Sequence, residues 1–273
     1  MPTTYVHHRF GRKVLDLLPA DIRGDLDPYM DYYDIGVHGP DILFYYHAFH
    51  HNAFNQYGVR VHHERAGVFF RKAIKVFKGQ LGQPEARAYL AGFMTHFILD
   101  SSCHPYINRR AKETGVSHTE IETDLDMVLM KEDGLNPFRV HKTQWIRPSI
   151  RKGQVIGPYY DQSAFRIYRG LVWQKFIVDH VFRSRFGLKR SVASVISRMA
   201  GAGSGEGSVM KVLKEHFIKS EINPRSRETI LTIKGLMIGC QEECADMMTD
   251  LMDALNRGDT AFAKHPRLQR NFS

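Results

Sequence analysis

The stretch YLAGFMTHFILDSSCHPYINRRAKETGVSHTEIE, residues 89–122, decides how this chain folds. Its ionisable side chains recur at four-residue steps: His96, Asp100 and His104, followed by His118 and Glu122. Residues four apart lie one above the other on the same face of a helix, so each pair can direct its side chains to one place. The stretch therefore predicts helices that carry rows of imidazole and carboxylate groups.

The apolar surroundings of His96 and Asp100 indicate what these groups do. Phe93, Phe97 and Leu99 make the segment a typical buried helix, yet it contains a histidine and an aspartate. An ionised carboxylate is seldom buried unless it is paired or binds a metal. Imidazole and carboxylate together suit zinc or another borderline divalent ion. Any one of these histidines could be a packing residue, but the whole set favours a metal site.

Composition is that of an ordinary globular protein except for its histidines and its charge. The chain has 273 residues, 43% hydrophobic and 25% charged, with 15 histidines, of which eight fall in the first 63 residues. A formal net charge of +9 favours anionic partners such as phosphate esters or acidic membrane surfaces. No run of Lys and Arg interleaved with aromatic residues stands out, so we find no specific nucleic-acid signal, and a merely basic soluble protein remains an alternative.

The cysteines and the hydropathy of the chain indicate the cellular compartment in which we expect the protein. Cys103, Cys240 and Cys244 form no CxxC pair and no disulfide framework, which is typical of a reducing compartment. The amino-terminal segment lacks the continuous apolar core of a secretory signal, and no stretch reaches the roughly 18 apolar residues of a membrane span. We therefore expect a soluble, cytoplasmic protein; the oligomeric state is not indicated.

Helical periodicity predicts an all-α fold, and no strand series or internal repeat is visible. We expect Asp41, after Gly39-Pro40, to open a short helix and Pro105 to stop the central helix. Ser117 is expected to cap a helix that starts at His118. The other predicted helices are 5–18, 62–77 opened by His62 and His63, 85–104, 118–129, 162–185, 191–199 and one long amphipathic helix, Ser226–Leu255; residues 139–158 are expected to be irregular.

We predict one helical domain that spans residues 1–273. The candidate metal ligands lie within residues 1–122, and a helical remainder covers 138–273. The tract AGAGSGEGS at 200–208 has the composition of a flexible loop, and because helical patterns continue on both sides we interpret it as a loop within that domain.

Four motifs together resemble the bacterial zinc-dependent phospholipase C family, which is related to the single-strand-specific zinc nucleases. They are PTTYVHHRFG (2–11), GVHGPDILFYY (36–46), GFMTHFILDSSCHPYI (92–107) and SHTEIE (117–122). The resemblance covers roughly residues 2–122. It implies a multi-helix fold of the zinc phospholipase C type, with two or three zinc ions in a helical cleft.

The resemblance also implies a ligand set. Asp100 resembles the carboxylate that bridges two ions. The ligands implied for the first ion are Asp41, His62, His96 and Asp100, those for the second are His104, His118 and Glu122, and His7 with Asp100 would hold the third. Because each histidine is doubled, His8 and His63 remain alternatives to His7 and His62. Of the histidines between 47 and 63 we expect only one or two to bind metal.

The leading functional hypothesis is metal-dependent phosphodiester hydrolysis of a phospholipid or related phosphoester, with possible peripheral contact with anionic lipid. Clustered divalent ions activate water and neutralise the phosphodiester, and Asp41 or Glu122 would assist proton transfer. One alternative is a zinc-dependent nuclease or nucleotide phosphohydrolase. Another is a metal-stabilised helical protein without activity, whose 226–255 helix binds a partner.

Overall fold

The computed structural model describes residues 4–48, 52–80, 82–182 and 221–272, and this part of the chain is helical and contains no strand. Its α-helices are α1 (Thr4–Leu15), α2 (Ala20–Leu26), α3 (Met30–Gly36), α4 (Ile42–Tyr45), α5 (Ala53–His63), α6 (Ala66–Lys78), α7 (Gln83–Thr114), α8 (His118–Glu132), α9 (Ile150–Ile156), α10 (Ala164–Phe176), α13 (Arg227–Gly239) and α14 (Gln241–Arg257). Short 3-10 turns connect several of them. The predicted all-α class is confirmed; the assignment of the chain to one domain stays a prediction.

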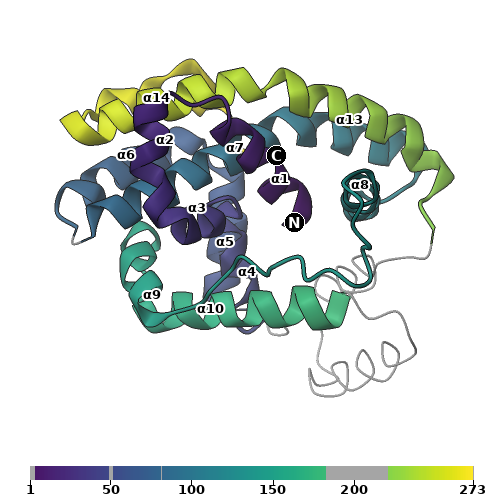
Figure 1. Cartoon of the computed structure of the whole chain (residues 1–273), viewed down its shortest axis with the longest axis horizontal. Coiled ribbons are helices and arrows are strands. Elements are labelled where there is room, and N and C mark those ends of the chain that lie inside the picture. The colour runs from purple at the N-terminus through teal and green to yellow at the C-terminus, as the bar shows by residue number, and fades with distance from the viewer. Residues whose placement is uncertain (1–3, 49–51, 81, 183–220, 273) are drawn as a thin grey trace.

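Helix α7 is the element against which many of the others pack. It has 32 residues, begins after Gly82 with Pro84 in its first turn, and ends at Gly115, whose positive φ of 71° closes the helix. Helices α1, α3, α6, α8, α13 and α14 all contact it (Figure 1). Because its middle turns are surrounded on every side, nearly every residue from Ala88 to Cys103 is buried. The ionisable groups of this segment therefore lie in the protein interior.

Helix α3 packs closely on α7 through two glycines. A Cβ atom on Gly36 would lie 2.2 Å from the carbonyl oxygen of Tyr89, and one on Gly92 would lie 2.2 Å from that of Tyr33. Because any side chain would collide at these two positions, only glycine permits the two backbones to pack this closely. This contact places the loop after α3, which carries Asp41, beside the face of α7 that carries His96.

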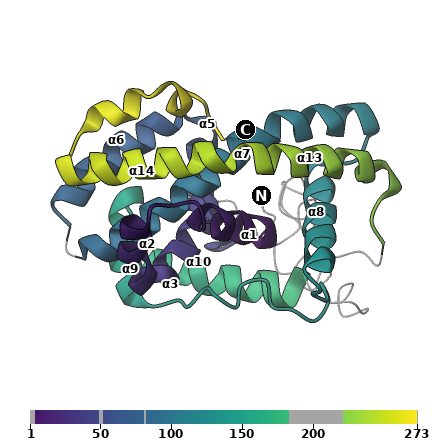
Figure 2. The same ribbon diagram turned by 45° about the horizontal axis from the view of Figure 1, so that its top comes forward.

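Two helices replace the single long helix expected over residues 226–255. The chain breaks at Cys240, where α13 ends and α14 begins, and the two helices lie nearly end to end along α7 (Figures 1 and 2). Apolar periodicity continues through the break, which is why the sequence predicted one helix. Cys240 and Cys244 are buried and free, as expected for packing residues.

The expectation that Pro105 stops the central helix is wrong. Helix α7 continues for nine residues beyond it, to Thr114. Proline removes one N–H donor and crowds the preceding turn, which costs free energy. Packing offsets that cost, because Ile107 is buried and Arg110 bonds Thr229 and Glu228 of the α13 region.

Two further boundaries also differ from expectation. His62 and His63 end α5 instead of opening the next helix: α5 starts from the capping box made by Asn52 and Asn55, and α6 begins only at Ala66. The stretch 139–158 contains α9, whose first turn is capped by the Ser149 hydroxyl. Both starts follow capping residues that apolar periodicity alone does not register.

Other expectations concern the segment 162–208 and the histidines at positions 50 and 51. Helix α10 is followed by a π-helix, Ile177–Phe182, within the predicted 162–185 segment. The predicted helix 191–199, the loop 200–208 and residues 50 and 51 lie outside the described residues. Among the described helices none combines the length and the apolar content needed to cross a membrane.

Candidate metal centre

Three candidate ligands project from successive turns of one face of α7. His96, Asp100 and His104 are all buried, with exposed fractions of 0%, 4% and 6%. The four-residue spacing predicted this alignment, and α7 remains regular across all three residues. A rigid, buried helix thus holds two imidazoles on either side of a carboxylate.

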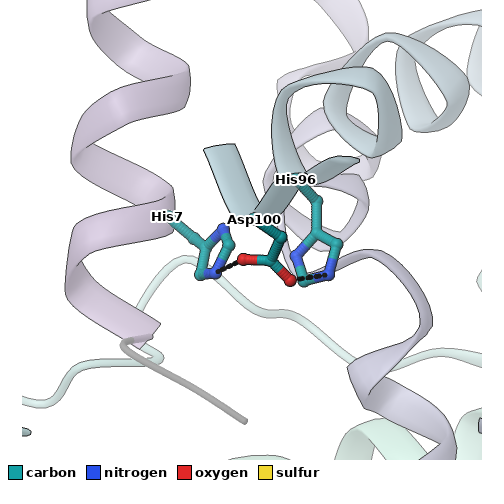
Figure 3. A group of neighbouring side chains, drawn as sticks. All are labelled: His7, His96 and Asp100. Atoms are coloured by element: carbon teal, nitrogen blue, oxygen red, sulfur yellow. Dashed lines mark ion pairs between the residues drawn. The ribbon is translucent and has the colours of Figure 1, made fainter. Parts of the chain in front are cut away.

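Asp100 lies at the middle of the cluster. Its Oδ1 is 3.2 Å from Nε2 of His7 and 3.3 Å from Nε2 of His104, and its Oδ2 is 3.2 Å from Nε2 of His96. Figure 3 shows the carboxylate between His7, which comes from α1, and His96. One carboxylate therefore faces three imidazoles from two helices, as a bridging ligand must.

Asp41 and His62 approach His96 from the other side. His62 Nδ1 is 2.8 Å from the carbonyl oxygen of Gly58, which can only accept, so this nitrogen carries the proton. In the neutral imidazole Nε2 is then an acceptor, and it lies 3.1 Å from Oδ1 of Asp41. Two acceptors facing each other at this distance require a proton or a cation between them.

Gly39 allows Asp41 and His96 to come together. It has a φ of +48°, and a Cβ atom there would lie 2.3 Å from the His96 ring. A larger residue would be strained and would displace the imidazole. The Gly-Pro of the GVHGPD motif is thus part of the site as well as a helix start.

His104, His118 and Glu122 form the second group. Glu122 Oε1 is 3.2 Å from Nε2 of His104 and 3.1 Å from Nε2 of His118. The other ring nitrogen of His118 bonds the side-chain oxygen of Asn108 at 2.7 Å, which directs Nε2 toward the carboxylate. The Ser117 hydroxyl caps α8 as predicted and so fixes where His118 starts.

All three carboxylates are buried, yet their pKa values are lowered, which favours the ionised form. Burial by itself would raise the pKa of Asp100, but its interactions with His104, His96 and His7 hold the pKa well below its usual range. Burial opposes ionisation of Asp41 as well, and the hydrogen bond with His62 lowers its pKa. The pKa of Glu122 is also held well below its usual range, with His118 and His104 among the groups that lower it against the effect of burial. The interior thus carries concentrated negative charge.

The histidines differ from one another in protonation. Burial lowers the pKa of His96 more than Asp100 and Asp41 raise it, so this imidazole is neutral and has a free lone pair. For His104 burial also lowers the pKa, but the combined effect of Asp100 and Glu122 is larger and raises it. A metal competes with a proton most directly at His104.

The ligand atoms fit divalent ions. Three groups have their ligand atoms within 4.8 Å of one another: His7, His96 and Asp100; Asp41, His62 and His96; and His104, His118 and Glu122. Two ligand atoms bound to one tetrahedral zinc ion lie about 3.3 Å apart, close to the nitrogen-to-oxygen distances of 3.1–3.3 Å found here. Neutral imidazoles and ionised carboxylates are the donors that zinc prefers.

All eight residues predicted as ligands are brought together, and the doubled histidines are distinguished. His7 faces Asp100, whereas His8 stacks on Trp145 at 3.6 Å between ring centroids. His62 faces Asp41, whereas His63 is exposed and lines a different cavity. His47 belongs to none of the three groups. The roles of the eight residues as ligands stay predictions.

Two residues beside the centre were missed by the sequence analysis. His38 is fully buried, and its Nε2 accepts a hydrogen bond from the Trp145 indole at 3.3 Å, so Nδ1 carries the proton. Phe272 is fully buried, with its ring 5.5 Å from that of His62 and 5.9 Å from that of His96. His38 could have been noticed in the quoted GVHGPD motif; nothing local marks Phe272.

A helical fold with a buried cluster of histidines and carboxylates defines a protein with candidate sites for divalent metal ions. A family model described as zinc dependent phospholipase C matches residues 6–168, a range that includes all eight candidate ligands. The chain therefore belongs to the zinc-dependent phospholipase C family, whose members are metal-dependent phosphodiester hydrolases. No curated protein and no solved structure matches it.

Proposed function

We propose that the protein hydrolyses a phospholipid at the phosphodiester bond on the glycerol side, with three zinc ions held by the cluster around Asp100. The observation that carries this proposal is the position of Asp100 between His7, His96 and His104. Asp100 would bridge the ion held by Asp41, His62 and His96 and the ion held with His7. His104, His118 and Glu122 would hold the other ion.

Zinc ions bound here would lower the pKa of a water molecule, neutralise the phosphodiester and stabilise the entering and leaving oxygens. The protein's own residues hold the charges that this requires. Asp41 and Glu122 are both ionised at neutral pH, so either can accept a proton from the attacking water. Attack on phosphorus breaks the bond to the glycerol oxygen, which leaves with a proton as diacylglycerol.

Two outer contacts would orient the ligands. The Gly58 carbonyl fixes the His62 ring and the Asn108 amide oxygen fixes that of His118, each by accepting from Nδ1. Partners of this kind maintain tautomer and ring direction, and their loss typically reduces metal affinity by about 10–100-fold.

We also propose a cytoplasmic location and peripheral contact with anionic lipid. Three buried, free cysteines support a cytoplasmic location, and fractionation of cells that produce the untagged protein tests it. The net charge of +9 supports peripheral contact with anionic lipid.

The first experiment measures metal content and activity on one sample of untagged protein. We expect three zinc ions per chain and zinc-dependent hydrolysis of a soluble short-chain phosphatidylcholine that exceeds hydrolysis of single-stranded DNA. Faster turnover of DNA would assign the centre to nuclease chemistry. Bound zinc without hydrolysis of any phosphodiester would reject the catalytic proposal and favour a structural centre.

A further inference from the structure

We propose that the protein has a second, non-catalytic site, which binds a phosphate-bearing anion in a cavity of about 480 Å³ beside the carboxyl-terminal segment. Two arginines and an asparagine line this cavity, and no carboxylate is among its lining residues. The lining residues are His63, Arg65, Ser101, Pro105, Gln269, Arg270 and Asn271.

The charge of the cavity is unbalanced. Arg65 and Arg270 contribute two positive charges, and neither forms an ion pair with a carboxylate among the described residues. Glu64, the acidic residue next to Arg65, pairs with Arg60 at 3.8 Å and does not line the cavity. Two guanidinium groups without a counter-ion favour an anionic occupant.

The walls of the cavity are held in place by the backbone. The N–H of Ala66 donates to the carbonyl of Arg270 at 2.9 Å, and the N–H of Phe272 donates to the carbonyl of His62 at 3.1 Å. These two bonds join residues 270–272 to the end of α5 and the start of α6. These bonds hold the backbones of Arg65 and Arg270, which are far apart in sequence, on adjacent segments beside the same cavity.

The cavity is separate from the metal centre although it lies close by. A much smaller cavity at the metal centre is lined by His7, Asp100, His104 and Glu122, and the two cavities share no lining residue. His63 and Ser101 of the larger cavity follow His62 and Asp100 directly in sequence. An occupant would thus contact residues next to the candidate ligands on the same two helices, through its own set of donors.

Phosphate is the anion that this lining suits best. An arginine guanidinium can donate two parallel hydrogen bonds to phosphoryl oxygens, and the side-chain amide of Asn271 adds a further donor. The volume exceeds that of a phosphate ion, so an attached alcohol would fit as well. The shared chemistry is a phosphoryl group, which an inorganic ion, a soluble phosphoester or an anionic lipid headgroup could supply.

Calorimetric titration of the zinc-loaded protein with inorganic phosphate tests the proposal. Phosphate is expected to bind at the zinc ions as well, so the wild type should show two classes of site. The double variant Arg65→Gln/Arg270→Gln should lose one class, with affinity reduced at least about tenfold. The control Arg71→Gln/Lys75→Gln removes two exposed charges of α6 elsewhere and should keep both classes.

Hydrolysis of the soluble short-chain substrate is measured on the same samples and should be unchanged in the double variant. Equal phosphate binding by wild type and double variant would overturn the proposal. Loss of soluble-substrate hydrolysis together with phosphate binding would overturn the claim of a separate site. The Arg65→Lys/Arg270→Lys variant should restore binding in part, which separates charge loss from misfolding should the first variant be unstable.

Vesicle flotation identifies the source of the phosphoryl group. Stronger retention of wild type than of Arg65→Gln/Arg270→Gln on phosphatidylglycerol vesicles, but not on phosphatidylcholine vesicles, assigns the cavity to anionic headgroups. Equal retention, with phosphate binding still lost in the variant, assigns it to a soluble phosphate or phosphoester. The phosphate titration does not depend on hydrolysis, so failure of this proposal and failure of the catalytic one are distinguishable.

Discussion

Phe272 and His62 are joined twice: their rings lie 5.5 Å apart, and the N–H of Phe272 donates to the carbonyl of His62 at 3.1 Å. The same ring also contacts His96. A residue 210 positions away in sequence, and outside the range matched by the family model, thus supports two candidate zinc ligands. The carboxyl-terminal segment is part of the structure of the metal centre.

Phe272→Ala should therefore affect both stability and zinc. Removal of a fully buried phenylalanine typically costs about 3–5 kcal/mol of unfolding free energy, and the freed space lets both imidazole rings move. We expect one zinc ion to bind at least about tenfold more weakly. Urea denaturation and competitive zinc titration measure the two effects.

Phe272→Leu provides the matched control, since it fills most of the same space. Its zinc affinity should be close to that of the wild type. With cobalt in place of zinc, its absorption spectrum should resemble that of the cobalt-substituted wild type. A Phe272→Ala protein that is folded and binds all its zinc with wild-type affinity would contradict the support that we assign to this ring.

Asp100→Asn tests the centre of the cluster. The amide keeps the shape of the side chain but loses the negative charge that faces three imidazoles. We expect at least one zinc ion to be lost per chain and hydrolysis to fall by about 10³-fold or more. Elemental analysis and turnover of the soluble substrate give the two values.

The corresponding control is Asp133→Asn, which changes a carboxylate that bonds Arg9 and Tyr5 outside the cluster. It should bind a full complement of zinc and show normal turnover. Full zinc and full activity in Asp100→Asn would reject the assignment of Asp100 as a bridging ligand.

Acidification should release zinc from the two ends of the cluster in a defined order. The pKa of His104 is raised, because Asp100 and Glu122 outweigh burial, whereas that of His96 is lowered by burial. As pH falls, a proton therefore takes the His104 lone pair before that of His96. Zinc should leave the group of His104, His118 and Glu122 first, when wild-type protein is dialysed at stepwise lower pH.

A variant identifies which ion leaves at each step. Glu122→Gln weakens the His104 group, so the release step at the higher pH should disappear and the lower one should remain. Retention of the higher step in this variant would show that the order has been assigned to the wrong group.

Gly39→Ala should disturb the ion held by Asp41, His62 and His96. A methyl group at this position meets the His96 ring at 2.3 Å and the backbone has a φ of +48°, so ring and turn must both shift. We expect at least about tenfold weaker binding of one zinc ion and a lower Tm. Gly79→Ala is the control, since a Cβ there meets nothing within 4 Å; equal zinc affinity in both variants would contradict the close approach.

The sequence by itself determined the helical class, the candidate ligands apart from the choice within each doubled histidine, and the way that α7 presents three of them. These features depend on short-range geometry: a four-residue step aligns His96, Asp100 and His104 on any regular helix, and Ser117 caps the helix that carries His118. The donor types followed from residue chemistry alone, and the resemblance to the family supplied their grouping.

Only the tertiary structure decided the features that depend on contacts between distant segments. The two members of each doubled histidine have the same chemistry, so the sequence does not distinguish them. The packing of α1 on α7, and of α5 on the turn that carries Asp41, brings His7 and His62 into the cluster. The helix continues past Pro105 because its later turns pack on α13, and Phe272 reaches the centre because the last residues return to α5. Local periodicity carries no information about such contacts, since they are stabilised by burial between residues far apart in the chain.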